Sequence, residues 1–197
     1  MVRGTLVFVN GGVRSGKTAF AENWLGAQRS GRLIYVATGR PADEEMNSRI
    51  RRHRQDRAAR PELWETIERP LDLPGILPII REGDALLIDC MTTWLANEMY
   101  EGIESGQPCH SRTGCIEKKI SELLGALSEM TDKATAVVVV SNEVLDEPLP
   151  DSADIRAYSE LLGRIHQKLV EAADLAYEMD AGIPLLRKPE NRIGGIG

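Results

Sequence analysis

The segment at residues 6–22, LVFVNGGVRSGKTAFAE, constrains the fold of this chain more than any other. It opens with a short apolar run, LVFV, which predicts a buried strand. The residues from Gly11 to Thr18 then fit G-x-x-x-x-G-K-[ST], the pattern of a phosphate-binding loop. Apolar residues at 19–21, 24 and 25 predict a helix directly after it. Strand, glycine-rich loop and helix in this order predict a nucleotide site near the start of the chain.

Each residue type in this loop has a chemical reason. Gly11 and Gly16 let the backbone turn and approach a phosphate closely. The N–H groups of the loop and the N-terminus of the following helix favour an anion. Lys17 is expected to bridge the β- and γ-phosphates as a catalytic residue, and the Thr18 hydroxyl to bind Mg²⁺. The alternative is a chance glycine turn before an ordinary helix. The presence of a strand directly before the motif, together with the helix directly after it, argues against this alternative.

Length and charge bound the remaining possibilities. The 197 residues are enough for one α/β domain, so we expect a single domain over residues 1–197. The formal net charge of −6 argues against a broad surface for nucleic acid or anionic membrane. The longest apolar run, at residues 134–140, is far too short to span a membrane. The first apolar run leads straight into the phosphate loop and not into a signal-peptide cleavage site, so a cytoplasmic protein is expected.

The three cysteines are Cys90, Cys109 and Cys115. Their small, odd number favours a reducing compartment over a disulfide framework. Cys109, His110 and Cys115 match no zinc-ligand spacing, and a fourth ligand is not evident. We therefore expect free thiols in a loop.

Strand and helix patterns alternate along the rest of the chain. Strands are predicted at residues 32–37, 64–68, 84–89, 135–140, 175–179 and 183–186. Helices are predicted at residues 43–57, 91–100, 116–130 and 154–173, with an uncertain one at 71–81 because of two prolines. Residues 102–114 are expected to form a surface loop, and the tail after Lys188 has no core pattern. The alternation predicts an α/β fold with a mostly parallel, doubly wound sheet and helices on both faces.

In such sheets ligands bind at the carboxyl ends of the strands. Asp89 ends one predicted strand, and we favour a magnesium-binding role for it over a helix cap. Thr38 follows another strand. Glu143 follows the strand at 135–140, and for this residue the sequence leaves a magnesium role and a solvated carboxylate equally open.

A basic stretch at residues 49–57, RIRRHRQDR, is the second notable feature. On a helix, Arg49, His53, Arg57 and Arg60 would share one stripe. A polyphosphate would relieve the repulsion between these arginines. Their charges would also favour the neutral, nucleophilic imidazole of His53. Composition alone favours a solvated basic face, so the nucleotide-binding alternative needs further support.

Several motifs that follow one another along the chain provide this support. The ordered series is GGVRSGKT, YVAT, EMNSRIRRHRQDR followed by WETIE, LLIDCMTTWLAN and VVVSNEV. It resembles the bifunctional adenosylcobinamide kinase / adenosylcobinamide-phosphate guanylyltransferase family of cobalamin biosynthesis. The similarity runs from about residue 6 to 144, and a weaker similarity continues to about residue 174. The RIRRHR segment with the following WETIE is the most particular part of it.

The resemblance implies a fold, an activity and a set of residues. Such enzymes phosphorylate adenosylcobinamide with ATP or GTP, and then transfer GMP from GTP to that phosphate through a covalent GMP–histidine, releasing pyrophosphate. The histidine falls on His53, and Mg²⁺ is the implied cofactor, at Thr18 and Asp89. The implied fold is a RecA-like P-loop sheet, assembled as a homotrimer with the site near a subunit boundary. The implied nucleotide contacts are Gly11, Gly12, Val13, Arg14, Ser15, Gly16, Lys17, Thr18, Val36, Ala37, Thr38, Arg54, Gln55, Asp56, Arg57, Glu68 and Asp89.

The chain departs from the family pattern after Val144. The family usually continues with a glycine-bearing stretch, whereas residues 145–150 read LDEPLP. A later helix carries His166, which we interpret as structural, in place of the usual asparagine. Two alternatives therefore stay open: a P-loop small-molecule kinase without guanylyl transfer, and a nucleotide-binding module that has lost turnover. A motor acting on nucleic acid is disfavoured by the acidic charge.

Overall fold

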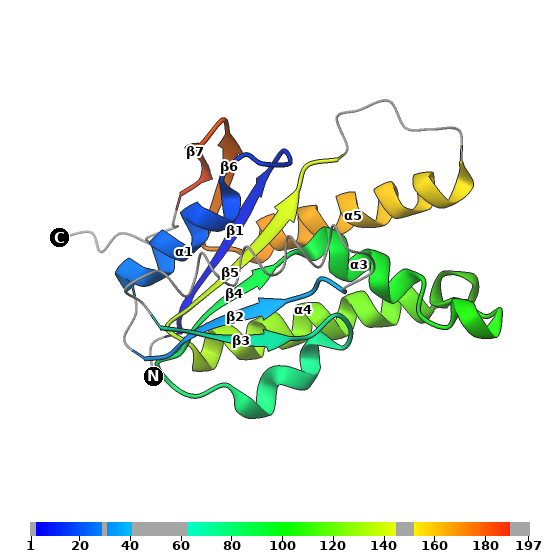
Figure 1. Cartoon of the computed structure of the whole chain (residues 1–197), viewed down its shortest axis with the longest axis horizontal. Helices are drawn as coiled ribbons and strands as arrows, with labels where there is room; N and C mark the ends of the chain where they lie inside the picture. The colour runs from blue at the N-terminus through cyan, green and yellow to red at the C-terminus, as the bar shows by residue number, and fades with distance from the viewer. Residues whose placement is uncertain (1–2, 29–30, 41–62, 145–151, 190–197) are drawn as a thin grey trace.

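The computed structural model describes residues 3–28, 31–40, 63–144 and 152–189. Within these ranges, seven strands form one sheet in the order β3-β2-β4-β5-β1-β6-β7 (Figure 1). The strands are β1 (Thr5–Gly11), β2 (Leu33–Ala37), β3 (Trp64–Glu68), β4 (Ala85–Asp89), β5 (Ala136–Asn142), β6 (Leu175–Asp180) and β7 (Ile183–Lys188). All neighbouring pairs are parallel except β6 with β7, which form an antiparallel hairpin. The predicted mostly parallel α/β fold is confirmed.

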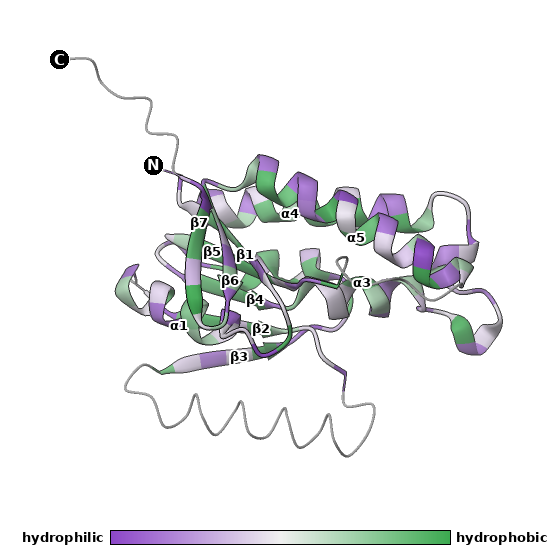
Figure 2. Ribbon diagram, turned by 90° about the horizontal axis from the view of Figure 1, so that it is seen from above, coloured by the Kyte–Doolittle hydropathy of each residue, from purple (hydrophilic) through white to green (hydrophobic). Residues whose placement is uncertain are grey.

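Helices cover both faces of the sheet, as predicted (Figure 2). The described helices are α1 (Lys17–Gln28), α3 (Met91–Met99), α4 (Cys115–Lys133), α5 (Ala153–Ala172) and the short 3₁₀ helices η1 (Leu73–Ile79), η2 (Ile103–Ser105) and η3 (Cys109–Ser111). One core cluster lies between the sheet and α1, and a larger one lies between the sheet and α3, α4 and α5. Among the described residues, no helix combines the length and the apolar character that a membrane span needs.

The most apolar predicted strand is the middle strand of the sheet. Side chains of β5 alternate between the two core clusters: Val137 and Val139 lie on the α4 and α5 face, and Val138 and Val140 on the α1 face. Because both faces are covered, every residue from Ala136 to Ser141 is buried, which explains the unbroken apolar run. β5 pairs with β4 on one side and β1 on the other, so the strand ends that carry polar residues converge at one edge.

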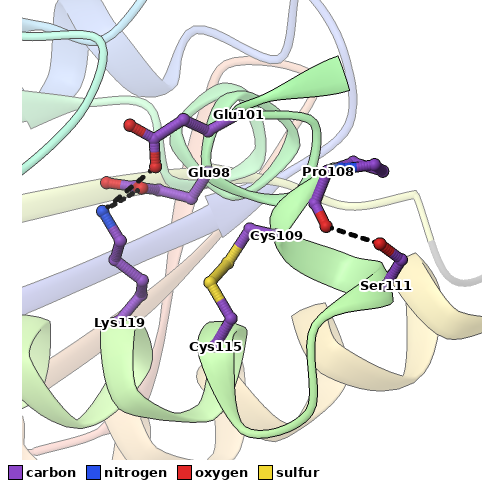
Figure 3. The surroundings of a disulfide bond; sticks show 7 residues. All are labelled: Glu98, Glu101, Pro108, Cys109, Ser111, Cys115 and Lys119. Carbon is purple, nitrogen blue, oxygen red and sulfur yellow. Dashed lines mark hydrogen bonds and ion pairs between the residues drawn. A yellow bond between two sulfur atoms is a disulfide. The ribbon is translucent and has the colours of Figure 1, made fainter. Parts of the chain in front are cut away.

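The prediction of free thiols at Cys109 and Cys115 is wrong, because these two residues form a disulfide (Figure 3). The segment between them turns back through hydrogen bonds such as that from Cys115 N to Arg112 O, which leaves their Cα atoms 5.5 Å apart. Cys109 is fully buried, and the segment at 102–114 contains η2 and η3, so it is not simply a surface loop. Cys90 is a free cysteine, as predicted.

The other expectations divide into those observed and those outside the described residues. The uncertain helix at 71–81 is the 3₁₀ helix η1, in which Pro78 has no N–H to donate to an α-helical turn. The final strand pair is present and extends to Lys188. The predicted helix at 43–57 and the tail at 190–197 lie outside the described residues.

Candidate active site

The loop between β1 and α1 adopts a tight conformation that requires glycine at two positions. A Cβ on Gly11 would lie 2.5 Å from the carbonyl oxygen of Met179 in β6, so no larger residue fits without a backbone shift. Gly16 has a φ of +88°, a region that other residues rarely adopt. Gly182, in the β6–β7 turn, donates its backbone N–H to Ser15 O at 3.1 Å. The β6–β7 hairpin therefore contacts and stabilises the phosphate loop.

Lys17 lies within the curve of this loop. It is buried, and its Nζ donates to the carbonyl oxygen of Gly12 at 2.7 Å. Burial lowers the pKa of Lys17, while nearby Asp89 and Cys90 act in the opposite direction. A phosphate oxygen at this point would give the ammonium group an anionic acceptor in place of a carbonyl. The remaining loop positions Gly12, Val13 and Arg14 are exposed.

Thr18, the last residue of the motif, is joined to Asp89 at the end of β4. Thr18 Oγ1 donates to Asp89 Oδ2 at 2.8 Å, and Tyr35 of β2 donates its hydroxyl to the same oxygen at 2.8 Å. A hydroxyl and a carboxylate suit Mg²⁺, which is commonly held by one or two protein oxygens together with phosphates and water. Within the described ranges, no group of three or more His, Cys, Asp or Glu side chains is arranged to hold a metal ion.

Tyr35 was not among the predicted site residues. Its position in an alternating strand, Leu33 and Tyr35 on one face, indicated the direction of its side chain. The partner of its hydroxyl was not visible, because it depends on the register in which β2 pairs with β4.

Thr38 connects β2 to the residue after Asp89. Its Oγ1 donates to Cys90 O and accepts from Cys90 N, both at 2.8 Å, and Asn97 of α3 donates to Thr38 O at 2.8 Å. Thr38 is fully buried, so its hydroxyl holds the backbone beside Asp89 and is not presented to solvent. This bonding gives Thr38 a positioning role at the site.

The other predicted positions on β2 and β3 differ in exposure. The Val36 side chain is wholly buried in the core. Ala37 is half-buried. Glu68, which pairs in register with Ala37 at the end of β3, is exposed.

A second polar network joins the ends of β4 and β5. Asn142 donates to Thr92 Oγ1 at 3.0 Å, and the Tyr158 hydroxyl of α5 donates to Thr92 O at 3.0 Å. Burial raises the pKa of the Cys90 thiol, and Asp89 raises it further. Burial and nearby Cys90 also raise the pKa of Tyr158 to about 12. Both groups therefore stay protonated at neutral pH and serve as neutral hydrogen-bonding groups.

Glu143 lies beside the phosphate loop. Its backbone N–H donates to Gly11 O at 2.8 Å, and its carboxylate accepts from Asn10 Nδ2 at 2.5 Å. Next to it, the hydroxyl of Ser141 and Nε2 of His166 lie 2.7 Å apart. Burial lowers the pKa of His166, although Glu143 acts in the opposite direction. His166 is thus a buried, bonded side chain, in agreement with its interpretation as structural.

The predicted nucleophile His53 and the predicted contacts Arg54, Gln55, Asp56 and Arg57 lie outside the described residues. The structure brings together the phosphate loop, Thr18, Thr38 and Asp89.

The chain is similar in sequence to several known proteins. Residues 7–186 match a family model described as cobinamide kinase / cobinamide phosphate guanyltransferase. The chain is 32% identical over 180 residues to the bifunctional adenosylcobalamin biosynthesis protein CobU of Escherichia coli K12, covering 90% of this chain and 97% of that protein. It is 34% identical over 181 residues to the bifunctional protein CobP of Pseudomonas aeruginosa, covering 91% of this chain and 95% of that protein.

A solved structure supports the fold independently. A prototypical ATPase from a bacterial type III secretion system superposes with a TM-score of 0.56 at 14% identity. The match covers 94% of this chain and 57% of the ATPase chain, so this chain spans little more than half of that protein. At such low identity the likeness concerns the P-loop fold alone.

Proposed function

This chain belongs to the cobinamide kinase / cobinamide phosphate guanyltransferase family, and from that membership we propose that it carries out both reactions on adenosylcobinamide, the second through a GMP–histidine intermediate. The observation that carries the proposal is the bonded pair of Thr18 and Asp89 beside the phosphate loop, within a sequence match that spans the domain. This pair and Lys17 are the groups that phosphoryl transfer needs around a nucleoside triphosphate.

In the kinase step, the loop N–H groups and the N-terminus of α1 bind the phosphates. Lys17 neutralises charge on the β- and γ-phosphates. Thr18 and Asp89 would hold Mg²⁺, which supplies further charge neutralisation at those phosphates. Tyr35 orients the Asp89 carboxylate by donating to the same oxygen that Thr18 contacts. The product is adenosylcobinamide phosphate.

In the guanylyl transfer step, His53 is the proposed nucleophile. An imidazole nitrogen attacks the α-phosphorus of GTP, and the bond to the bridging oxygen breaks with release of pyrophosphate. Adenosylcobinamide phosphate then attacks the same phosphorus and releases His53. The arginines around His53 in the sequence, among them Arg54 and Arg57, are suited to stabilise charge on the α-phosphate. Exposed Glu68, at the end of the strand that follows this segment, is proposed to contact the nucleotide.

The experiment that tests this proposal is labelling with GTP radioactive at the α-phosphate. The wild type is expected to form an acid-labile covalent label, and His53→Ala is expected to form none. His110→Ala is the matched control, because His110 lies in η3 with its ring packed against that of Tyr100. Full guanylyl transfer by His53→Ala would overturn the histidine mechanism. Absence of label on the wild type, with GTP bound, would favour a kinase without guanylyl transfer or a binding module.

Further parts of the proposal concern context. We propose a homotrimer, by resemblance to the family, and a cytoplasmic location, because ATP and GTP are substrates. Size-exclusion chromatography with light scattering tests the assembly state directly.

A further inference from the structure

Glu143 and Asp89 lie on opposite faces of the sheet at the edge that carries the phosphate loop. Phe8 of β1 packs in the core cluster on the α5 face. Because side chains alternate along a strand, Asn10 lies on that face too, and its bond to Glu143 places that carboxylate there. Asp89 is bonded instead to Thr18 of α1 and lies on the α1 face. The site therefore has two carboxylates in two different surroundings.

This separation matches the geometry of phosphoryl transfer. The phosphate loop and the start of α1 bind the nucleotide phosphates on the α1 face of the sheet edge. The acceptor hydroxyl must attack the γ-phosphorus roughly in line with the leaving oxygen, and thus from the side away from the β-phosphate. An acceptor hydroxyl on the α5 face would lie beside Glu143 and apart from the Thr18–Asp89 pair on the α1 face.

Glu143 is also held by the strand that carries the loop. β1 and β5 pair in parallel with Gly11 opposite Asn142, so Glu143 immediately follows the last paired residue. Its N–H is bonded to Gly11 and its carboxylate to Asn10, while its side chain remains half-exposed. The carboxylate is thereby positioned relative to the phosphates and accessible to a substrate.

We propose that Glu143 is the general base of the kinase step, an inference that rests on the proposed function. Its carboxylate accepts the proton of the acceptor hydroxyl as that oxygen bonds to the γ-phosphorus. The bond from the γ-phosphorus to the bridging oxygen breaks, and the electron pair leaves with the nucleoside diphosphate. Guanylyl transfer has no such requirement, because its acceptor is a phosphate monoester that is already largely ionised at neutral pH.

The test measures the two half-reactions of Glu143→Gln separately in the full chain. With adenosylcobinamide and ATP, kcat is expected to fall about 100-fold or more, the size of a general-base contribution. Two quantities are expected to stay within about threefold of the wild-type values, because neither depends on a base. They are the KM for ATP and the rate of guanylyl transfer from GTP to separately prepared adenosylcobinamide phosphate. Formate is expected to restore part of the kinase activity of Glu143→Ala. Glu129→Gln, an exposed carboxylate of α4, is the matched control.

Two results would overturn the inference. Kinase activity of Glu143→Gln within about tenfold of the wild type would exclude a general base. The rates of both half-reactions could instead fall equally in Glu143→Gln and Glu143→Ala, without rescue by formate. That result would assign Glu143 a structural or metal-binding role. Failure of the proposed function is recognised separately, because the wild type itself would then lack one of the two activities.

Discussion

Thr18 and Asp89 are joined by a hydrogen bond of 2.8 Å although 71 positions separate them in the chain. The bond connects the start of α1 to the end of β4 across the intervening β5. Tyr35 donates to the same carboxylate oxygen, so three elements meet at one atom. Three side-chain oxygens therefore lie together at the proposed magnesium site.

Replacing Asp89 by Asn should lower kcat of both half-reactions by about 100-fold, because the variant removes a charge that stabilises Mg²⁺ beside the transferring phosphate. The protein should need more Mg²⁺ for half-maximal rate. Steady-state kinetics over a range of Mg²⁺ concentrations measure both effects. Asp132→Asn, an exposed residue of α4, should behave as the wild type. An unchanged Mg²⁺ dependence in Asp89→Asn would contradict the assignment.

Lys17→Ala should abolish nucleotide binding or turnover, because the variant removes the positive charge within the curve of the phosphate loop. Calorimetric titration with GTP and the kinase assay give the two readouts. Lys133→Ala, in the last turn of α4, controls for the loss of a lysine as such. Unchanged activity would refute the assignment of the phosphate loop.

The Cys109–Cys115 disulfide should contribute about 2 kcal/mol to the free energy of unfolding, as expected for a short closed loop in the chain-entropy description. Urea unfolding of the wild type with and without reductant measures this difference. The double variant Cys109→Ala and Cys115→Ala should be insensitive to reductant. If reductant left the wild-type transition unchanged, the pair would not be bonded in solution.

Lys119→Met should destabilise the protein by about 3 kcal/mol, the cost of leaving a buried charge without its partner. Lys119 Nζ lies 2.9 Å from the fully buried carboxylate of Glu98 and 3.3 Å from that of Glu101 (Figure 3). Burial acts to lower the pKa of Lys119, but the two glutamates outweigh it and raise the pKa overall. The neighbouring variant Lys118→Met removes an exposed charge and should change stability by less than about 0.5 kcal/mol. Equal effects would show that the Glu98 pair does not matter.

His166 should make folding sensitive to pH on the acid side of neutrality. Since burial lowers its folded-state pKa, the unfolded state binds more protons below the ordinary histidine value of about 6.5. The stability that neutral His166 contributes is fully present above the ordinary histidine pKa. It is lost as the pH falls through the pKa of His166 in the folded state. The slope is at most about 1.4 kcal/mol per pH unit for one proton. Chemical unfolding can be measured from about pH 7.5 to about pH 5, a range that brackets the ordinary histidine pKa. The wild type and His110→Gln should lose stability over this range, whereas the profile of His166→Asn should be flatter.

Much of the fold was predictable because its signals are local. The apolar run of β5, the alternation of α5 and the phosphate-loop motif each depend on residues close in sequence. The bond from Tyr35 to Asp89 depends on strand register, and the bond between Cys109 and Cys115 depends on a turn whose closure the sequence pattern does not encode. The sequence indicated that Thr38 lies at a strand end. It did not indicate that the Thr38 hydroxyl forms hydrogen bonds with the backbone of Cys90. Contacts between distant elements are the part that local reasoning missed.

The position of β1 in the sheet has a consequence for the order in which the protein is built during translation. Although β1 is made early, its neighbours are β5 and β6, with Thr5 opposite Ala136 and Val7 opposite Leu175. At ribosomal speeds of about 5–20 residues per second, β1 waits on the order of ten seconds for its first partner strand. A nascent chain therefore gains a formed phosphate loop only after β5 and β6 have been synthesised, and chains that stop before β5 are not expected to capture nucleotide.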